Sequence, residues 1–188
     1  MKVILFLDND GVICLSNNWG GRQKKWKKFK KLNPDVSLLN QAPVDVRFDD
    51  FDKKAVKVLN QVLEKTGAEI VVSSDWKLHA TLNELGEYYL SQGISKKPID
   101  MTPNLGDFDS TANDLFMWKG WLEKKRILEI QQYLELNPNV EKWVAVDDLN
   151  MSPEFNGGYG LNNFVLTPRM TEGIKQSGIK EKLIDFLK

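Results

Sequence analysis

Hydrophobic residues in this chain fall into short continuous runs that alternate with stretches of helical periodicity. The continuous runs predict strands buried on both faces, at residues 3–7, 68–74, 97–103, 142–148 and 164–168. Apolar residues repeat at helical spacing in the stretches between and after them, which predicts helices at residues 49–67, 78–93, 121–137 and 179–188. Because strands that alternate with helices form βαβ units, we expect an α/β fold with a doubly wound, mainly parallel sheet.

The helix expected at residues 78–93 has a clear apolar face. Leu78, Leu82, Leu85 and Tyr89 fall on that face, and the lone histidine, His79, lies in the first turn. A structural role is the simpler interpretation of a histidine at such a position.

Two stretches lack a regular pattern. Residues 12–48 are mostly polar and show no clear period, and residues 104–119 form an expected acidic loop. A chain of 188 residues has the length of one ordinary domain. We therefore expect a single domain over residues 1–188, with a small insertion at about residues 12–48 that serves as a flap or cap.

Composition limits the possible classes of function only weakly. The chain has 26 basic and 26 acidic residues, so its net charge suggests neither a nucleic acid nor a membrane as partner. Cys14 is the single cysteine, which excludes an internal disulfide and fits a reducing compartment. No run of apolar residues approaches the roughly 18 that a membrane span needs. We therefore expect a cytoplasmic protein.

Polar residues gather where three of the predicted strands end. The carboxyl ends of parallel strands share one edge of a sheet, and ligands bind there. We therefore expect these residues to meet at one site. They are Asp8 and Asp10, Ser73 and Ser74, and Asp147 and Asp148.

Four carboxylates at one partly dry edge repel one another unless a cation lies between them. Mg²⁺ prefers oxygen ligands, takes one or two carboxylates and also binds substrate phosphate. With that cation bound, Asp8 can ionise and attack phosphorus as a carboxylate nucleophile. Asp10, two residues on, can protonate the leaving oxygen and later activate water. Gly11 lets the chain turn sharply and keeps bulk away from the site.

Three segments resemble motifs of the haloacid dehalogenase superfamily of phosphohydrolases. "LFLDNDGV" is similar to its first motif, "IVVSS" to its second and "VAVDD" to its fourth. The resemblance implies that Ser73 donates a hydrogen bond to the transferring phosphoryl group, with Ser74 as the alternative. It also implies that Asp147 and Asp148 complete a Mg²⁺ site with Asp8 and the carbonyl of Asp10.

The third motif of this superfamily is a Lys or Arg near the start of a helix, which balances the charge of the nucleophile and the phosphate. Lys124, Lys125 and Arg126 are the candidates. A run of bases at a helix start is also typical of a solvated face. We select Arg126 by the closer resemblance described next.

"TGAEIVVSSDWK", "KRILEI" and "TPRMTEGI" resemble the subfamily of these domains found in RNA-repair (Swiss-army-knife) proteins. Two positions depart from that subfamily, because Lys77 stands where arginine is usual and Ile127 replaces a glycine. The resemblance implies a phosphatase that acts on a macromolecular phosphate, with a nucleic-acid 3′-phosphate as the leading substrate. A phosphoprotein, including phosphotyrosine, is the alternative.

Other interpretations of the acidic motifs stay open. Asp10-Gly11 can be an ordinary turn, with Asp147 capping the loop that follows it. A phosphoacceptor receiver domain also uses acidic residues and Mg²⁺, but it needs a Lys after its fifth strand, where this chain has "LTP". A binding module that kept the fold and lost turnover is the third alternative.

A basic run with two aromatic residues, "RQKKWKKFKK", lies inside the insertion. Such a run can hold a polyanion by phosphate contacts, with Trp26 or Phe29 stacking on a base. The alternatives are contact with an anionic surface, or a solvated helix whose two aromatic residues pack inward. The basic residues of the expected polyanion contact are Arg22, Lys24, Lys25, Lys27, Lys28, Lys30 and Lys31.

Overall fold

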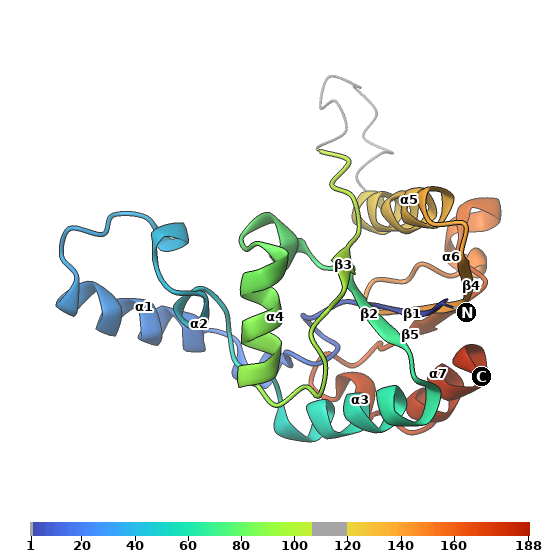
Figure 1. Cartoon of the computed structure of the whole chain (residues 1–188), viewed down its shortest axis with the longest axis horizontal. Helices are drawn as coiled ribbons and strands as arrows, with labels where there is room; N and C mark the ends of the chain where they lie inside the picture. The colour runs from blue at the N-terminus through green and yellow to red at the C-terminus, as the bar shows by residue number, and fades with distance from the viewer. Residues whose placement is uncertain (1, 107–119) are drawn as a thin grey trace.

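The computed structural model describes residues 2–106 and 120–188, which contain a five-stranded parallel sheet (Figure 1). The strand order is β3-β2-β1-β4-β5, and β1 therefore lies at the centre. This arrangement confirms the expected α/β fold with a parallel sheet. The strands are β1 (Lys2–Leu7), β2 (Glu69–Val72), β3 (Asp100–Met101), β4 (Val140–Asp147) and β5 (Phe164–Leu166).

Helices cover both faces of the sheet, with α3 and α7 side by side on one face and α5 on the other (Figure 1). The helices of the described residues are α1 (Gly21–Leu32), α2 (Val44–Arg47), α3 (Lys53–Thr66), α4 (Leu82–Ser91), α5 (Trp121–Leu136), α6 (Pro153–Asn156) and α7 (Ile179–Leu187). Short 3-10 helices include η1 (Ser16–Asn18), η2 (Leu39–Gln41) and η3 (Asp75–Leu78). None of the helices in residues 2–106 and 120–188 combines the length and hydrophobicity needed to cross a membrane.

Strand β1 shows why both faces must be covered. Leu5 and Leu7 point into the core under α3, α4 and α7, and Ile4 and Phe6 point into the core under α5. The ring of Phe6 meets that of Tyr133 on α5 edge to face, with 5.4 Å between the ring centroids. A strand buried on both faces explains the continuous apolar run in the sequence.

Helix α4 begins later than the sequence pattern predicts. The Thr81 hydroxyl accepts a hydrogen bond from the Glu84 N–H at 3.3 Å, and the Glu84 carboxylate accepts from the Thr81 N–H at 2.9 Å. This capping box starts the helix at Leu82. The expected place of Leu78 and His79 in α4 is therefore wrong, because Leu78 belongs to η3 and is 45% exposed.

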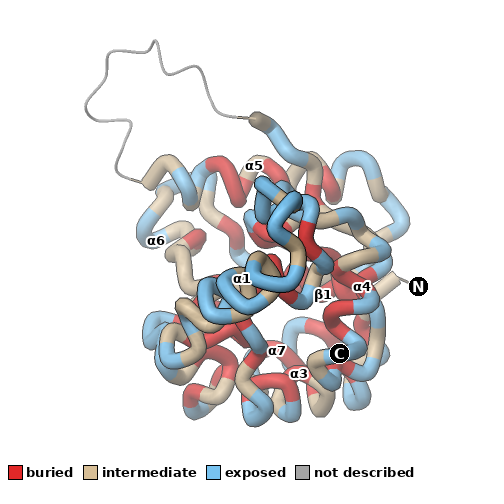
Figure 2. The backbone as a smooth tube through the Cα atoms, turned by 90° about the vertical axis from the view of Figure 1, so that its left-hand side faces the viewer, coloured by how far each residue is buried: buried red, intermediate tan, exposed pale blue. Residues whose placement is uncertain are grey.

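The insertion between β1 and α3 contains η1, α1, η2 and α2. Figure 2 shows α1 in the foreground, exposed or half-buried along its length, and none of its residues is buried. Trp26 and Phe29 stack on each other, with ring centroids 6.0 Å apart, rather than entering the core. The acidic loop expected at residues 104–119 lies, from residue 107 on, outside the described residues.

Candidate active site

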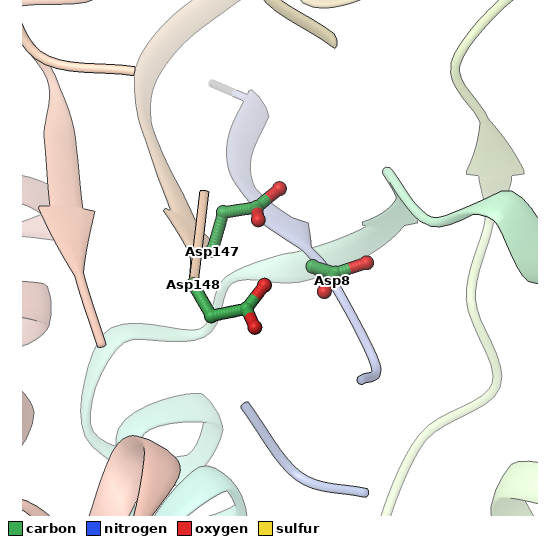
Figure 3. A group of neighbouring side chains, drawn as sticks. All are labelled: Asp8, Asp147 and Asp148. Carbon is green, nitrogen blue, oxygen red and sulfur yellow. The ribbon is translucent and has the colours of Figure 1, made fainter. Parts of the chain in front are cut away.

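Three carboxyl groups meet at the ends of β1 and β4. Asp8 follows β1, Asp147 ends β4 and Asp148 comes next, and the pairing of Leu7 with Val146 puts the two strand ends level. One oxygen from each carboxyl group lies within 4.8 Å of the others (Figure 3). Asp8 and Asp147 are only 5% and 1% exposed, so these charges are largely removed from water.

Gly11 allows this cluster to close. Its φ of 70° is a left-handed conformation that other residues rarely adopt. A Cβ at this position would lie 2.3 Å from Oδ2 of Asp148, which is a steric overlap. The glycine after the two aspartates is therefore required both for the turn and for the approach of Asp148.

Arg126, on α5, supplies a buried positive charge to the cluster. Its Nη1 lies 3.0 Å from Oδ1 of Asp8 and 3.3 Å from Oδ2 of Asp147, and it also donates to the carbonyl of Ser73. The guanidinium therefore joins the ends of β1, β2 and β4 and brings a positive charge to Asp8 and Asp147.

The neighbouring lysines point elsewhere. The Lys124 ammonium lies 5.5 Å from the ring centroid of Tyr159, and that of Lys125 lies 5.5 Å from the ring centroid of Trp121. Of the three candidate bases at this helix start, Arg126 is thus the one that the structure brings to Asp8.

Burial and mutual repulsion raise the pKa values of the acidic cluster. Burial, opposed by Arg126 and aided by Asp148 and Asp10, raises the pKa of Asp8 to about 7. Burial and the charge of Asp8 raise the pKa of Asp147 as well. A single guanidinium does not compensate several carboxylates, so the fully ionised cluster would carry a net negative charge.

Asp10 lies at the site, but its carboxylate is not part of the cluster of Asp8, Asp147 and Asp148. Its Oδ2 accepts a hydrogen bond from Nε1 of Trp76 at 2.8 Å, and burial raises its pKa. The side chain borders a hollow of about 300 Å³ that is also lined by Trp19 and Arg22.

Ser73 follows β2, and its hydroxyl group makes no hydrogen bond to the described residues. Its main-chain N–H donates to the carbonyl of Leu7 at 2.9 Å, which holds the two strand ends together. Its Oγ is buried and has no hydrogen-bond partner among the described residues. A buried hydroxyl without a partner beside Arg126 is suited to a ligand oxygen. Ser74, also buried, precedes η3.

A second buried ion pair, which sequence reasoning missed, connects η3 to α5. The Lys77 ammonium lies 2.5 Å from Oε2 of Glu129, and the two side chains are 4% and 1% exposed. Lys77 also donates to Oγ1 of Thr102 at 2.7 Å and to the carbonyl of Pro103 at 3.0 Å. Burial lowers the pKa of Lys77, although Glu129 opposes that effect. The signal was present in "SSDWK" and "KRILEI", where both residues fall in motif segments.

Replacement of Lys77 by methionine is expected to destabilise the fold by about 3–5 kcal/mol, because Glu129 would be left as a buried charge without its partner. Urea unfolding measures this change. The double variant Lys77→Met/Glu129→Met is expected to lose much less, since no unpaired charge remains. Lys97→Met, which breaks an exposed pair with Glu87, is the matched control and should change stability by no more than about 1 kcal/mol. A Lys77→Met variant as stable as this control would contradict the expectation.

Residues 167–174, "TPRMTEGI", contact the loop that follows β1. Thr167 donates from Oγ1 to the carbonyl of Gly11 at 3.4 Å, and the Ile174 N–H donates to the carbonyl of Val12 at 2.9 Å. A Cβ on Gly173 would lie 2.2 Å from that same carbonyl oxygen of Val12. This segment therefore positions the loop that carries Asp8 and Asp10.

The donor set suits Mg²⁺. Three carboxylates each offer an oxygen within 4.8 Å of the others, and nitrogen and sulfur ligands are absent from that group of described residues. Mg²⁺ prefers such oxygen ligands. Asp8, Asp147 and Asp148 are therefore the residues that could hold the metal.

The parallel sheet, the acidic ends of β1 and β4 and the serine at the end of β2 together define the fold and site of the haloacid dehalogenase (HAD) superfamily. Residues 4–177 match the family described as the HAD domain in Swiss Army Knife RNA repair proteins, and the chain belongs to that family. A search of curated proteins and a search of solved structures each found no significant match. Membership supports a phosphatase-type hydrolase.

Proposed function

We propose that this chain is a Mg²⁺-dependent phosphomonoester hydrolase that works through an aspartyl-phosphate on Asp8. The observation that carries the proposal is the cluster of Asp8, Asp147 and Asp148, whose oxygens lie within 4.8 Å of one another, with Arg126 3.0 Å from Asp8. We also propose that residues 1–188 act as one domain, with residues 12–48 as its cap.

In the first step, an oxygen of Asp8 attacks phosphorus and the bond from phosphorus to the leaving oxygen breaks. Asp10 gives its proton to that oxygen, and burial, which raises the pKa of Asp10, favours the protonated form that this step needs. The Ser73 hydroxyl and the Arg126 guanidinium hold the oxygens of the transferring group.

In the second step, Asp10 takes a proton from water, and the water oxygen attacks phosphorus. The bond between phosphorus and Asp8 breaks, which releases phosphate and restores the Asp8 carboxylate. Asp8, Asp147, Asp148 and the carbonyl of Asp10 are the groups that would hold Mg²⁺. The bound metal would supply the positive charge that lets Asp8 ionise close to a phosphate.

The preferred substrate in this proposal is a nucleic-acid 3′-phosphate. The basic helix α1 supports it, although two of its seven bases are engaged within the chain. Lys25 pairs with Asp50 at 2.6 Å, and Lys30 donates to the carbonyl of Pro34 at 3.1 Å. The bases that remain exposed for a polyanion are Arg22, Lys24, Lys27, Lys28 and Lys31. A phosphoprotein is the alternative macromolecular substrate.

The reaction class can be tested with p-nitrophenyl phosphate. We expect release of nitrophenol that requires added Mg²⁺ and stops when EDTA is added, because the acidic cluster needs a divalent cation. If the chain releases no nitrophenol at any metal concentration, it is a binding module and the proposal is wrong.

A further inference from the structure

Two adjoining hollows extend from Asp10 under the cap. The first, of about 300 Å³, is lined by Asp10, Trp76 and Trp19. The second, of about 450 Å³, lies between α1, η2, α2 and the residue after η3. Arg22 and Gln23 line both hollows, so the second hollow adjoins the first, which borders the proposed general acid.

The walls of the second hollow suit a flat ring with polar edges. Trp26 and Phe48 provide aromatic surface, whereas Gln23, Asn40 and His79 provide hydrogen-bonding groups around it. The volume falls within the range of about 300–1,000 Å³ that small-molecule sites occupy. A nucleobase has both an aromatic face and polar edges, but the ring of a phosphotyrosine has no polar edge apart from its ester oxygen.

Arg22 adds a positive charge at the junction of the hollows. Its main-chain N–H donates to Oδ1 of Asp49 at 2.6 Å, and the same carboxylate accepts from the Gly20 N–H at 3.2 Å. The start of α1 is therefore anchored to the body of the protein. The side chain of Arg22 is exposed and makes no ion pair with any residue in 2–106 or 120–188. A phosphodiester next to the terminal nucleoside would meet this charge, which also attracts the Asp10 carboxylate in the same hollow.

We propose that the two adjoining hollows are a leaving-group subsite for the terminal nucleotide of a phosphorylated nucleic-acid strand. Trp26 stacks on the base, Gln23 and Asn40 meet its polar edges, and Arg22 binds the adjoining phosphodiester. The subsite rests on the proposed function, because the terminal nucleotide reaches the hollows only if its phosphate group is bound at Asp8. Its ligand is a nucleotide rather than a phosphopeptide.

The test compares two substrates with the same type of leaving oxygen. One is a short 3′-phosphorylated oligoribonucleotide, and the other is glycerol 2-phosphate, which has a secondary alkyl oxygen but no base. We expect Trp26→Leu and Arg22→Gln each to lower kcat/KM for the oligonucleotide by about tenfold, with less than about twofold change for glycerol 2-phosphate. Lys182→Gln on α7 and Phe155→Leu on α6, which change exposed residues outside the hollows and outside the basic helix α1, are the matched controls.

A binding measurement separates failure of the subsite from failure of the proposed function. Fluorescence anisotropy of a labelled 3′-phosphorylated oligonucleotide on the Asp8→Asn variant needs no turnover. If the wild-type chain shows no phosphatase activity, weaker binding after Trp26→Leu or Arg22→Gln would support the subsite and overturn the proposed function. Equal losses for both substrates, no loss for the oligonucleotide, or the same loss for a phosphotyrosine peptide would overturn the subsite.

Discussion

Asp8→Asn is expected to lower kcat for p-nitrophenyl phosphate by about 10⁴-fold or more, since an amide oxygen cannot act as the nucleophile that the proposed mechanism requires. The substitution changes the chemistry of the side chain but hardly its shape. Asparagine has nearly the same size, and it can still accept a hydrogen bond from Arg126, which lies 3.0 Å from the native carboxylate. Steady-state release of nitrophenol in saturating Mg²⁺ is the measurement.

Loss of activity in Asp8→Asn must be separated from loss of structure. The variant removes one of three crowded acids, so its thermal midpoint in EDTA should be no lower than that of the wild type. Asp185→Asn, an exposed position on α7, is the matched control and should retain full activity. An Asp8→Asn protein that keeps more than about a tenth of the wild-type kcat would rule out Asp8 as the nucleophile.

Arg126→Ala is expected to reduce both activity and stability. The side chain is 7% exposed and pairs with Asp8 and Asp147, so its removal leaves buried carboxylates without compensation and costs about 3–5 kcal/mol in unfolding free energy. Activity should also fall by about 10²–10³-fold, because the guanidinium no longer holds the phosphoryl oxygens. Urea unfolding in EDTA and nitrophenol release in Mg²⁺ measure the two effects.

The instability of Arg126→Ala should depend on pH in a defined direction. Asp8 already has a folded-state pKa of about 7, above its ordinary value of 3.8, and loss of Arg126 raises that pKa further. A carboxyl group with a raised folded pKa destabilises the fold progressively as the pH rises from the unfolded value through the folded one. The loss of unfolding free energy in Arg126→Ala, relative to the wild type, should therefore be larger at pH 8 than at pH 5 in EDTA. Arg169→Ala, whose side chain is 67% exposed, is the control. A deficit that does not change with pH would contradict the assignment of Arg126 as the compensating charge.

Local patterns were sufficient to predict most of the fold. The buried strands β1, β2 and β4 appear as continuous apolar runs, and α3, α5 and α7 as apolar residues at helical spacing. The start of α4 was misplaced because Leu78 fits the helical spacing, whereas the capping box at Thr81 decides where the helix begins. For residues 22–31 the sequence allows a helix only as one of several alternatives, because the segment has too few apolar residues to define a buried helical face.

The acidic residues of the candidate site were predictable because they lie at the carboxyl ends of strands. Asp8, Asp147 and Asp148 follow or end strands that pair in the sheet, so a parallel topology brings them together. The choice among Lys124, Lys125 and Arg126 was different. All three lie on one turn of α5, and a run of adjacent bases does not show which of them points toward the sheet.

The sequence by itself determined the order of strands and helices and the acidic residues that a parallel sheet collects at one edge, because these depend on local hydrophobic pattern and on strand direction. Only the tertiary structure decided that Arg126 reaches Asp8, that Asp10 turns toward Trp76, and that Lys77 forms a buried pair with Glu129. These contacts join residues that are far apart in the chain, most of them on different elements. Their geometry follows from how helices pack on the sheet, and no local spacing encodes it.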